Sequence, residues 1–199
     1  MIDQLLIIFA KNPRLGNVKS RLAATVGPQA ALLIYQQLLD HTRQITKDLP
    51  VDKALFYSES PWPTELWGDP YIHKKQCGGD LGDKMLEAFQ WGFEQGYGRV
   101  CIVGSDCWEL TAELVMRAFD SLNEQQVVLG PTYDGGYYLL GMNELHPILF
   151  QNKTWSSSKV LEETTEDLKR YGLCYKQLAV LNDVDREQDL PQALKALLS

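Results

Sequence analysis

Short apolar runs alternate with amphipathic stretches along the chain, and this alternation limits the folds that the sequence can adopt. The first run, residues 5–9, is apolar without a break, which is typical of a strand buried on both faces of a parallel sheet. A basic loop follows, and Gly27-Pro28 then begins a helical periodicity over residues 28–46. Further strands are predicted at 54–57, 71–76, 100–103, 127–129, 138–140 and 174–180, and further helices at 81–95, 111–124, 158–171 and 190–198. This order predicts an α/β protein, a three-layer α/β/α sandwich with a mostly parallel, Rossmann-like sheet.

Length and charge exclude several classes of protein. The 199 residues suit one domain with a substantial core, so residues 1–199 are expected to form a single domain. With 19 basic and 26 acidic residues the net charge is −7, which argues against a nucleic-acid partner. No apolar run is long enough for a membrane span, and the amino terminus lacks the basic start of a signal peptide. The four cysteines form no Cys-x-x-Cys pair, so we expect no zinc site or disulfide framework and predict a cytoplasmic protein.

The loop after the first strand is unusually basic for an acidic protein. Its sequence FAKNPRLGNVKSRLA, residues 9–23, contains Lys11, Arg14, Lys19 and Arg21. It is not a Walker A loop, because Val18 rather than glycine precedes Lys19. Ligands of parallel sheets bind beyond the carboxyl ends of the strands, where such cations suit a polyphosphate. Taken singly, Lys11 and Arg14 are equally well explained as solvated surface charges.

A second candidate site is VGSDCWEL, residues 103–110. Asp106 directly follows a buried strand, and the small residues Gly104 and Ser105 leave room for a ligand. A carboxylate in this place can anchor a divalent metal that also binds phosphate oxygens. The alternative is that Asp106 caps the next helix, although Thr111 is better placed for that role. We therefore expect Lys19 and Asp106 to face one shared cleft.

A third candidate is LGPTYDGGYYLLGM, residues 129–142. Gly135 and Gly136 after Asp134 permit positive backbone angles or the close approach of a ligand, which Tyr137 and Tyr138 would flank. The alternative is a simple hairpin turn, since Asp-Gly is a strong turn signal between apolar strands. A turn and a site can coexist at this position.

An acidic segment, LNDVDREQDL, lies near the carboxyl terminus. Asp183 and Asp185 are two residues apart, so in an extended segment both lie on one face and can jointly bind a cation. An equally good interpretation is an acidic loop in which Asp185 or Asp189 stabilises the last helix.

These segments carry a family resemblance, together with QCGGDLGDKM at 76–85 and TWSSSKVLEET at 154–164. The chain resembles the bacterial DUF2064 family of glycosyltransferases with the GT-A fold, within the nucleotide-diphospho-sugar transferase superfamily. It is also similar in plan to the guanylyltransferases that act on phospholactate and molybdenum cofactor. The matching segments occur in order and span nearly the whole chain.

The resemblance implies roles for particular residues. Lys19 and Arg21, with Arg14, would contact the nucleotide phosphates, Asp106 would bind Mg²⁺ or Mn²⁺, and Gln76, Asp80 and Gly82 occupy the place where related nucleotidyltransferases read the base. Together with the candidates from the loops, the predicted nucleotide-binding residues are Lys11, Arg14, Lys19, Arg21, Gln76, Asp80, Gly82 and Ser105, the substrate-binding residues are Gly135, Gly136, Tyr137 and Trp155, the metal ligands are Asp106, Asp183 and Asp185, and the catalytic residues are Asp134 and Lys19. Two positions depart from the family pattern: Trp108 replaces a proline, where it can reshape the loop or offer a stacking face, and Arg186 replaces a threonine.

Three functions are consistent with these residues. The first is a metal-dependent glycosyltransferase with a nucleoside diphosphate sugar donor and a small-molecule acceptor, in which Asp134 is the general base. The second is a nucleotidyltransferase that joins a nucleoside triphosphate to a phosphorylated small molecule and releases pyrophosphate. The third is a non-catalytic nucleotide-binding or interaction protein that docks through surface tryptophans, Trp62 and Trp67.

Overall fold

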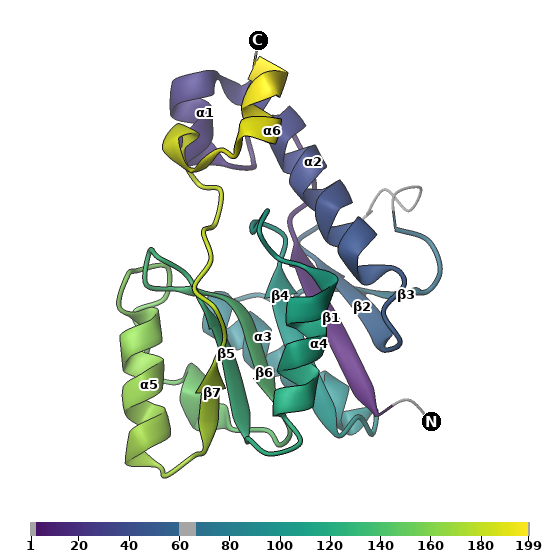
Figure 1. Cartoon of the computed structure of the whole chain (residues 1–199), viewed down its shortest axis with the longest axis vertical. Coiled ribbons are helices and arrows are strands. Elements are labelled where there is room, and N and C mark those ends of the chain that lie inside the picture. The colour runs from purple at the N-terminus through teal and green to yellow at the C-terminus, as the bar shows by residue number, and fades with distance from the viewer. Residues whose placement is uncertain (1–2, 60–66, 199) are drawn as a thin grey trace.

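The computed structural model in Figure 1 describes residues 3–59 and 67–198. One sheet contains the seven strands in the order β3-β2-β1-β4-β6-β5-β7. The strands are β1 (Gln4–Ala10), β2 (Asp52–Tyr57), β3 (Tyr71–Lys75), β4 (Arg99–Gly104), β5 (Val127–Pro131), β6 (Tyr137–Met142) and β7 (Tyr175–Gln177). β6 runs antiparallel to both of its neighbours, β4 and β5, and the remaining pairs of strands are parallel. The mostly parallel sheet predicted from the sequence is confirmed.

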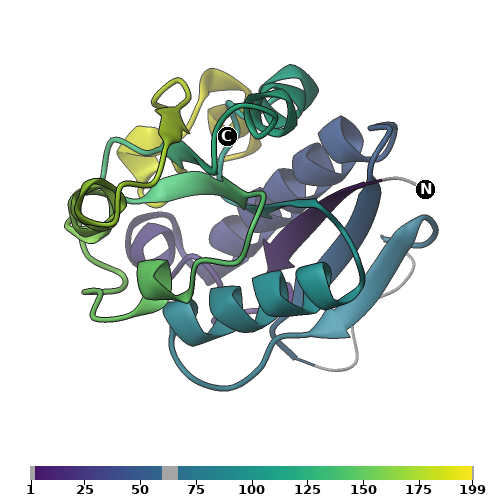
Figure 2. The ribbon, with the colours of Figure 1, turned by 90° about the horizontal axis from the view of Figure 1, so that it is seen from below.

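Helices cover both faces of this sheet (Figure 2), as predicted. The α-helices are α1 (Ser20–Val26), α2 (Pro28–Thr46), α3 (Leu81–Glu94), α4 (Ala112–Ser121), α5 (Val160–Arg170) and α6 (Gln192–Lys195). The 3₁₀ helices are η1 (Pro147–Phe150), η2 (Glu187–Asp189) and η3 (Ala196–Leu198). α2 and α4 pack with Leu6 and Ile8 on one face, whereas α3 and α5 pack with Leu5 and Ile7 on the other. Successive residues of β1 are therefore all buried, which explains its unbroken apolar sequence.

A third, smaller core joins the carboxyl-terminal segment to α1 and α2. Leu22 of α1 and Ile34 of α2 pack against Val184, Leu190 and Leu194 from the carboxyl-terminal segment. Figure 1 shows this segment rising from β7 and ending beside α1 and α2. The contact fixes the acidic stretch around residue 184 next to α1 and α2.

Some predicted elements differ from those in the structure. The basic loop is shorter than expected because residues 20–26 form α1, a helix that is too short to show a clear periodicity. The last helix is also shorter than predicted, because Pro191 precedes α6 and four residues later the chain continues as η3. β7 contains three residues rather than seven.

The proposed tryptophan docking surface is wrong for Trp67. This side chain is 1% exposed and packs edge-on against Tyr71, in the core on the face of the sheet that α2 and α4 cover. Trp62 lies outside the described residues. None of the helices that the structure describes has the length and apolar character of a membrane span.

Candidate active site

The direction of each strand brings the predicted site residues to one edge of the sheet. β1 and β4 end at Ala10 and Gly104, and because these strands are parallel their carboxyl ends lie at the same edge. β5 also ends there, and β6 begins there because it runs in the opposite direction. The segment after β7 crosses this edge through bridges between Thr132 and Leu181 and between Cys107 and Asp183.

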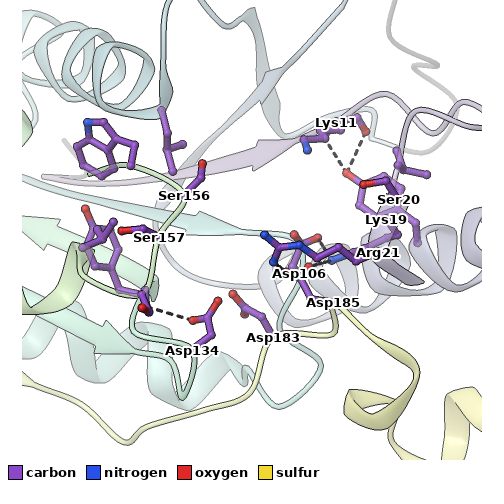
Figure 3. A pocket seen from close by; sticks show the side chains of 18 residues that line it. Lys11, Lys19, Ser20, Arg21, Asp106, Asp134, Ser156, Ser157, Asp183 and Asp185 are labelled. Carbon is purple, nitrogen blue, oxygen red and sulfur yellow. Dashed lines mark hydrogen bonds and ion pairs between the residues drawn. The ribbon is translucent and has the colours of Figure 1, made fainter. Parts of the chain in front are cut away.

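A pocket of about 570 Å³ opens at this edge (Figure 3). It is lined by Lys11, Val18, Lys19, Ser20, Arg21, Tyr35, Leu81, Asp106, Asp134, Gly136, Tyr137, Trp155, Ser156, Ser157, Ser158, Val160, Asp183 and Asp185. A second pocket of about 430 Å³ shares Lys11, Asp106, Tyr137 and Asp183 with the first and adds Gln76, Lys84 and Ser105. The two therefore adjoin as one cleft, which confirms that Lys19 and Asp106 share an opening.

Lys19 is the best-fixed cation in this pocket. Its backbone lies in the left-handed region, with φ 50° and ψ 48°, at the residue before α1. Its side chain is 4% exposed, and Nζ lies 2.9 Å from Asp106 Oδ1 and 3.4 Å from Asp185 Oδ1. Arg21 Nη1 lies 3.2 Å from the other oxygen of Asp185. A non-glycine residue in this conformation costs about 1 kcal/mol, so neighbouring contacts must hold it in place.

Asp183 completes a crowded group of acids. The bridge with Cys107, supported by a 2.9 Å hydrogen bond from Val184 N to Asp106 O, places Asp183 beside Asp106. Burial, followed by repulsion from Asp106, raises the pKa of Asp183 to about 7, although Lys19 opposes this shift. Burial, more than the neighbouring charges, therefore disfavours the ionised form of Asp183.

Asp134 lies in the turn that joins β5 to β6, which confirms the predicted hairpin. Thr132 Oγ1 and Gly136 N donate hydrogen bonds of 2.5 and 3.1 Å to Asp134 Oδ1. Gly135 has φ 87°, and a Cβ there would lie 2.1 Å from the carbonyl oxygen of Ser158. A glycine is therefore required at 135 by both its backbone angle and its close neighbour.

The segment 155–158 forms the wall opposite the basic side chains, and sequence reasoning identified only Trp155 in it. Figure 3 shows Ser156 and Ser157 on one side of the pocket and Lys11, Lys19 and Arg21 on the other. A Cβ at Gly82 would lie 2.3 Å from Trp155 Nε1, so Gly82 serves to pack Trp155 against α3. The run of three serines was the only signal of this wall in the sequence, and serines are common in ordinary loops.

Tyr35 is a second lining residue that the sequence did not reveal as part of a site. Its hydroxyl accepts a 2.7 Å hydrogen bond from Lys11 N and lies 3.3 Å from Ser105 Oγ. Burial, with a further contribution from the charge of Asp106, raises its pKa. In the sequence Tyr35 is one of several inward-facing residues of a helix, so nothing distinguishes it from the core. It links the loops after β1 and β4.

Other predicted residues lie outside the two pockets. Arg14 is exposed and forms an ion pair of 2.6 Å with Glu59. Asp80 is the N-cap of α3 and accepts a hydrogen bond from Asp83 N. Their roles in nucleotide binding remain predictions without support from pocket geometry.

The structure decides between the alternative roles of Asp106, of Asp185 and Asp189, and of Trp108. Thr111 caps α4, so Asp106 is free of that role. Asp189 accepts hydrogen bonds from the backbone amides of residues 185 and 186, whereas α6 begins after Pro191 without a side-chain cap, so neither Asp185 nor Asp189 caps the last helix. Trp108 stacks on His41 with ring centroids 4.6 Å apart and packs in the third core, so it offers no stacking face to either pocket.

The acidic residues of the pocket offer the oxygen ligands that Mg²⁺ and Mn²⁺ prefer, but they meet only part of the requirement for a metal site. Within residues 3–59 and 67–198, no three His, Cys, Asp or Glu side chains are arranged to hold a metal by themselves. Mg²⁺ is commonly bound by one or two carboxylates, with substrate phosphates and water completing its coordination. Asp106 and Asp183, which repel each other, fit that smaller requirement.

The sheet order and the location of the cleft define an α/β protein with the fold of nucleotide-diphospho-sugar transferases and nucleotidyltransferases. The profile of the family described as uncharacterized proteins conserved in bacteria, DUF2064, matches residues 39–157. The chain belongs to this family. A comparison with curated proteins finds no match.

Three solved structures illustrate the similarity. A candidate nucleotide-diphospho-sugar transferase from Desulfovibrio desulfuricans G20 is 30% identical, with a TM-score of 0.90 over 100% of this chain and 97% of its own. The 4-diphosphocytidyl-2C-methyl-D-erythritol synthase of Anaerococcus prevotii is 12% identical, with a TM-score of 0.63 over 100% and 97%. CMP:2-keto-3-deoxy-manno-octonic acid synthetase in complex with CTP is 9% identical, with a TM-score of 0.58 over 98% of each chain. The last two share the fold alone.

Proposed function

We propose that this protein is a metal-dependent glycosyltransferase that transfers a sugar from a nucleoside diphosphate sugar to a small hydroxylated acceptor. One observation carries the proposal: the buried Lys19 side chain and Asp106 meet in a single pocket that Asp134 also lines. Cations, acids that suit a metal, and a candidate base are thereby gathered around one space. The similarity to a candidate nucleotide-diphospho-sugar transferase supports this class of reaction.

The division of charge within the pocket supports transfer to a hydroxyl. Lys11, Lys19 and Arg21 occupy one side, where they suit the diphosphate of the donor. Ser156 and Ser157 lie on the opposite side, in a segment that also contributes Trp155 and Ser158 to the lining, and none of these side chains is basic. An aromatic ring with hydroxyl groups suits an uncharged hydroxyl compound better than a phosphorylated one.

The residues divide the chemical work accordingly. Asp134 takes the proton of the acceptor hydroxyl, whose oxygen bonds to the sugar carbon as the bond from that carbon to the diphosphate breaks. Lys19 and Arg21 stabilise the negative charge that the departing nucleoside diphosphate acquires. Asp106 and Asp183 would hold Mg²⁺ or Mn²⁺, which supplies further positive charge to the diphosphate, whereas Asp185 pairs with Lys19 and Arg21. The cleft beside Gln76 and Ser105 would hold the nucleoside.

Nucleotidyl transfer is the second candidate, favoured by the number of cations. Three basic side chains in one pocket also match the higher charge of a nucleoside triphosphate. This reaction would release pyrophosphate rather than a nucleoside diphosphate, so its product distinguishes it.

The test combines binding with product analysis. The protein is incubated with UDP-glucose, GDP-mannose and the four nucleoside triphosphates, with Mg²⁺ or with EDTA, and thermal stability and released phosphates are measured. We expect a Mg²⁺-dependent stabilisation by a nucleotide sugar, followed by release of the nucleoside diphosphate when hydroxylated acceptors are added. Asp106→Asn should abolish both effects, and Asp48→Asn, an exposed control at 87% side-chain exposure, should change neither. Pyrophosphate release would instead establish the second candidate, and no nucleotide-dependent stabilisation would contradict both.

A further inference from the structure

The ammonium group of Lys19 lies among the carboxylates, at the position that a bound divalent cation would otherwise take. Its ammonium group contacts Asp106 at 2.9 Å and Asp185 at 3.4 Å, and its side chain is almost completely buried. A divalent cation bound to Asp106, the carboxylate that Lys19 and the expected metal site have in common, would lie within a few ångströms of this ammonium group. Since two cations at such a distance repel strongly where water is partly excluded, the two occupants compete.

The backbone holds Lys19 in this position without help from a ligand. Val18 and Leu22 on either side are 3% and 0% exposed, and they anchor the left-handed turn before α1 in the cores. Arg21 binds the second oxygen of Asp185 and so keeps that carboxylate facing the loop. The packing of this loop therefore fixes the ion pairs of Lys19, on the side of the pocket where the diphosphate is proposed to bind.

We propose that Lys19 acts as a resident counter-ion that excludes free divalent cations and yields to them only when a diphosphate enters. The negative phosphate oxygens give the ammonium group a new partner in the same pocket, and Asp106 is then available to a metal. The nucleotide and the metal consequently bind with positive cooperativity. At each stage a cation neutralises the carboxylates: Lys19 before the diphosphate binds, and the metal afterwards. This inference rests on the metal and the diphosphate of the proposed function.

The test measures Mn²⁺ binding, by electron paramagnetic resonance and calorimetry, without any turnover. Wild-type protein should bind Mn²⁺ alone weakly and should bind it at least about 10-fold more tightly when saturated with UDP. Lys19→Met should bind Mn²⁺ alone at least about 10-fold more tightly than wild type and should lose most of the effect of UDP. Lys19→Gln is the second variant, because its amide keeps hydrogen bonds to both carboxylates if the methionine variant fails to fold.

Lys11→Met is the matched control. Lys11 lines the same pocket and carries the same charge, but it forms no ion pair among the described residues. Its loss should tighten Mn²⁺ binding only about 2-fold through long-range charge. Equal effects of the two substitutions, or tight Mn²⁺ binding by wild type without UDP, would overturn the proposal while leaving the proposed function intact. If UDP-saturated wild type binds no Mn²⁺, the metal dependence of the proposed function fails, and the counter-ion role fails with it.

Discussion

Two buried lysines at different places in the fold have opposite surroundings. Lys153 precedes α5 and has a side chain that is 1% exposed; it pairs with Asp167, which Arg170 also contacts. Lys19, at the pocket, faces two carboxylates that are themselves 43% and 38% exposed. Two cations thus share one acid at α5, whereas at the pocket Lys19 pairs with two acids, one of which Arg21 also contacts.

The difference separates a structural ion pair from an exchangeable one. Around Lys153 the acid is itself only 14% exposed, so removing the lysine would leave a poorly solvated charge with only the exposed Arg170 beside it. Around Lys19 the acids are open to water, and the second oxygen of Asp106 forms no ion pair among the described residues, so it remains available to another cation. A buried cation beside solvated acids is therefore suited to exchange, and one beside a buried acid is suited to stability.

The largest effect is expected at the structural pair. Lys153→Met should lower the free energy of unfolding by roughly 4 kcal/mol, because Asp167 loses its buried partner. Urea denaturation measures this loss, and the activity of each folded molecule should be unchanged. Arg170→Met, at the exposed partner of the same acid, should cost under about 1 kcal/mol. Similar losses for both variants would contradict the distinction.

At the pocket, the same substitution should affect function rather than stability. Lys19→Met should lower the rate of sugar transfer roughly 100-fold, because the leaving diphosphate loses a positioned cation. Its free energy of unfolding should change by less than about 1 kcal/mol, since water can solvate Asp106 and Asp185. Steady-state kinetics and urea denaturation on one preparation measure both quantities. A loss of stability as large as that of Lys153→Met would remove the contrast.

The pH dependence of the free energy of unfolding tests whether the ionised carboxylate of Asp183 destabilises the folded protein. Since its pKa is raised from 3.8 to about 7, the folded protein binds more protons than the unfolded chain between these values. Stability contributed by this group therefore falls as pH rises from about 4 to 7. In EDTA, Asp183→Asn should raise the free energy of unfolding by about 2 kcal/mol at pH 8, and the gain should shrink toward pH 4. A gain independent of pH would show that charge is not its cause.

The smallest effect is expected at a third buried lysine, Lys53 in β2. Its Nζ donates hydrogen bonds of 2.8 and 2.9 Å to the carbonyl oxygens of Leu49 and Val51, and burial lowers its pKa. Lys53→Met removes two hydrogen bonds but also removes the cost of burying a charge, so we expect a loss of less than about 1 kcal/mol. Thermal unfolding at neutral pH measures it. A loss near that of Lys153→Met would show that carbonyl partners stabilise a buried lysine as well as a carboxylate does.

Local sequence signals predicted the elements most accurately where they were long. α2 has the predicted bounds, 28 to 46, because Gly27-Pro28 marks its start and its apolar positions repeat over five turns. α1 was missed because seven residues give too few repeats, and Trp67 was wrongly placed at the surface because nothing local reveals the contact with Tyr71. The convergence of the loops near Lys19 and Asp106 was predictable from a rule about strand ends.

The sequence by itself determined the α/β architecture, the family and the edge of the sheet at which the candidate site lies. These properties follow from the order and polarity of short segments, which neighbouring residues encode. Tertiary structure alone decided that Lys19 bridges Asp106 and Asp185, which are 87 and 166 residues away along the chain. It also decided that residues 155–158 form the facing wall. Such contacts depend on how separate loops pack, and a pattern of neighbouring residues does not contain that information.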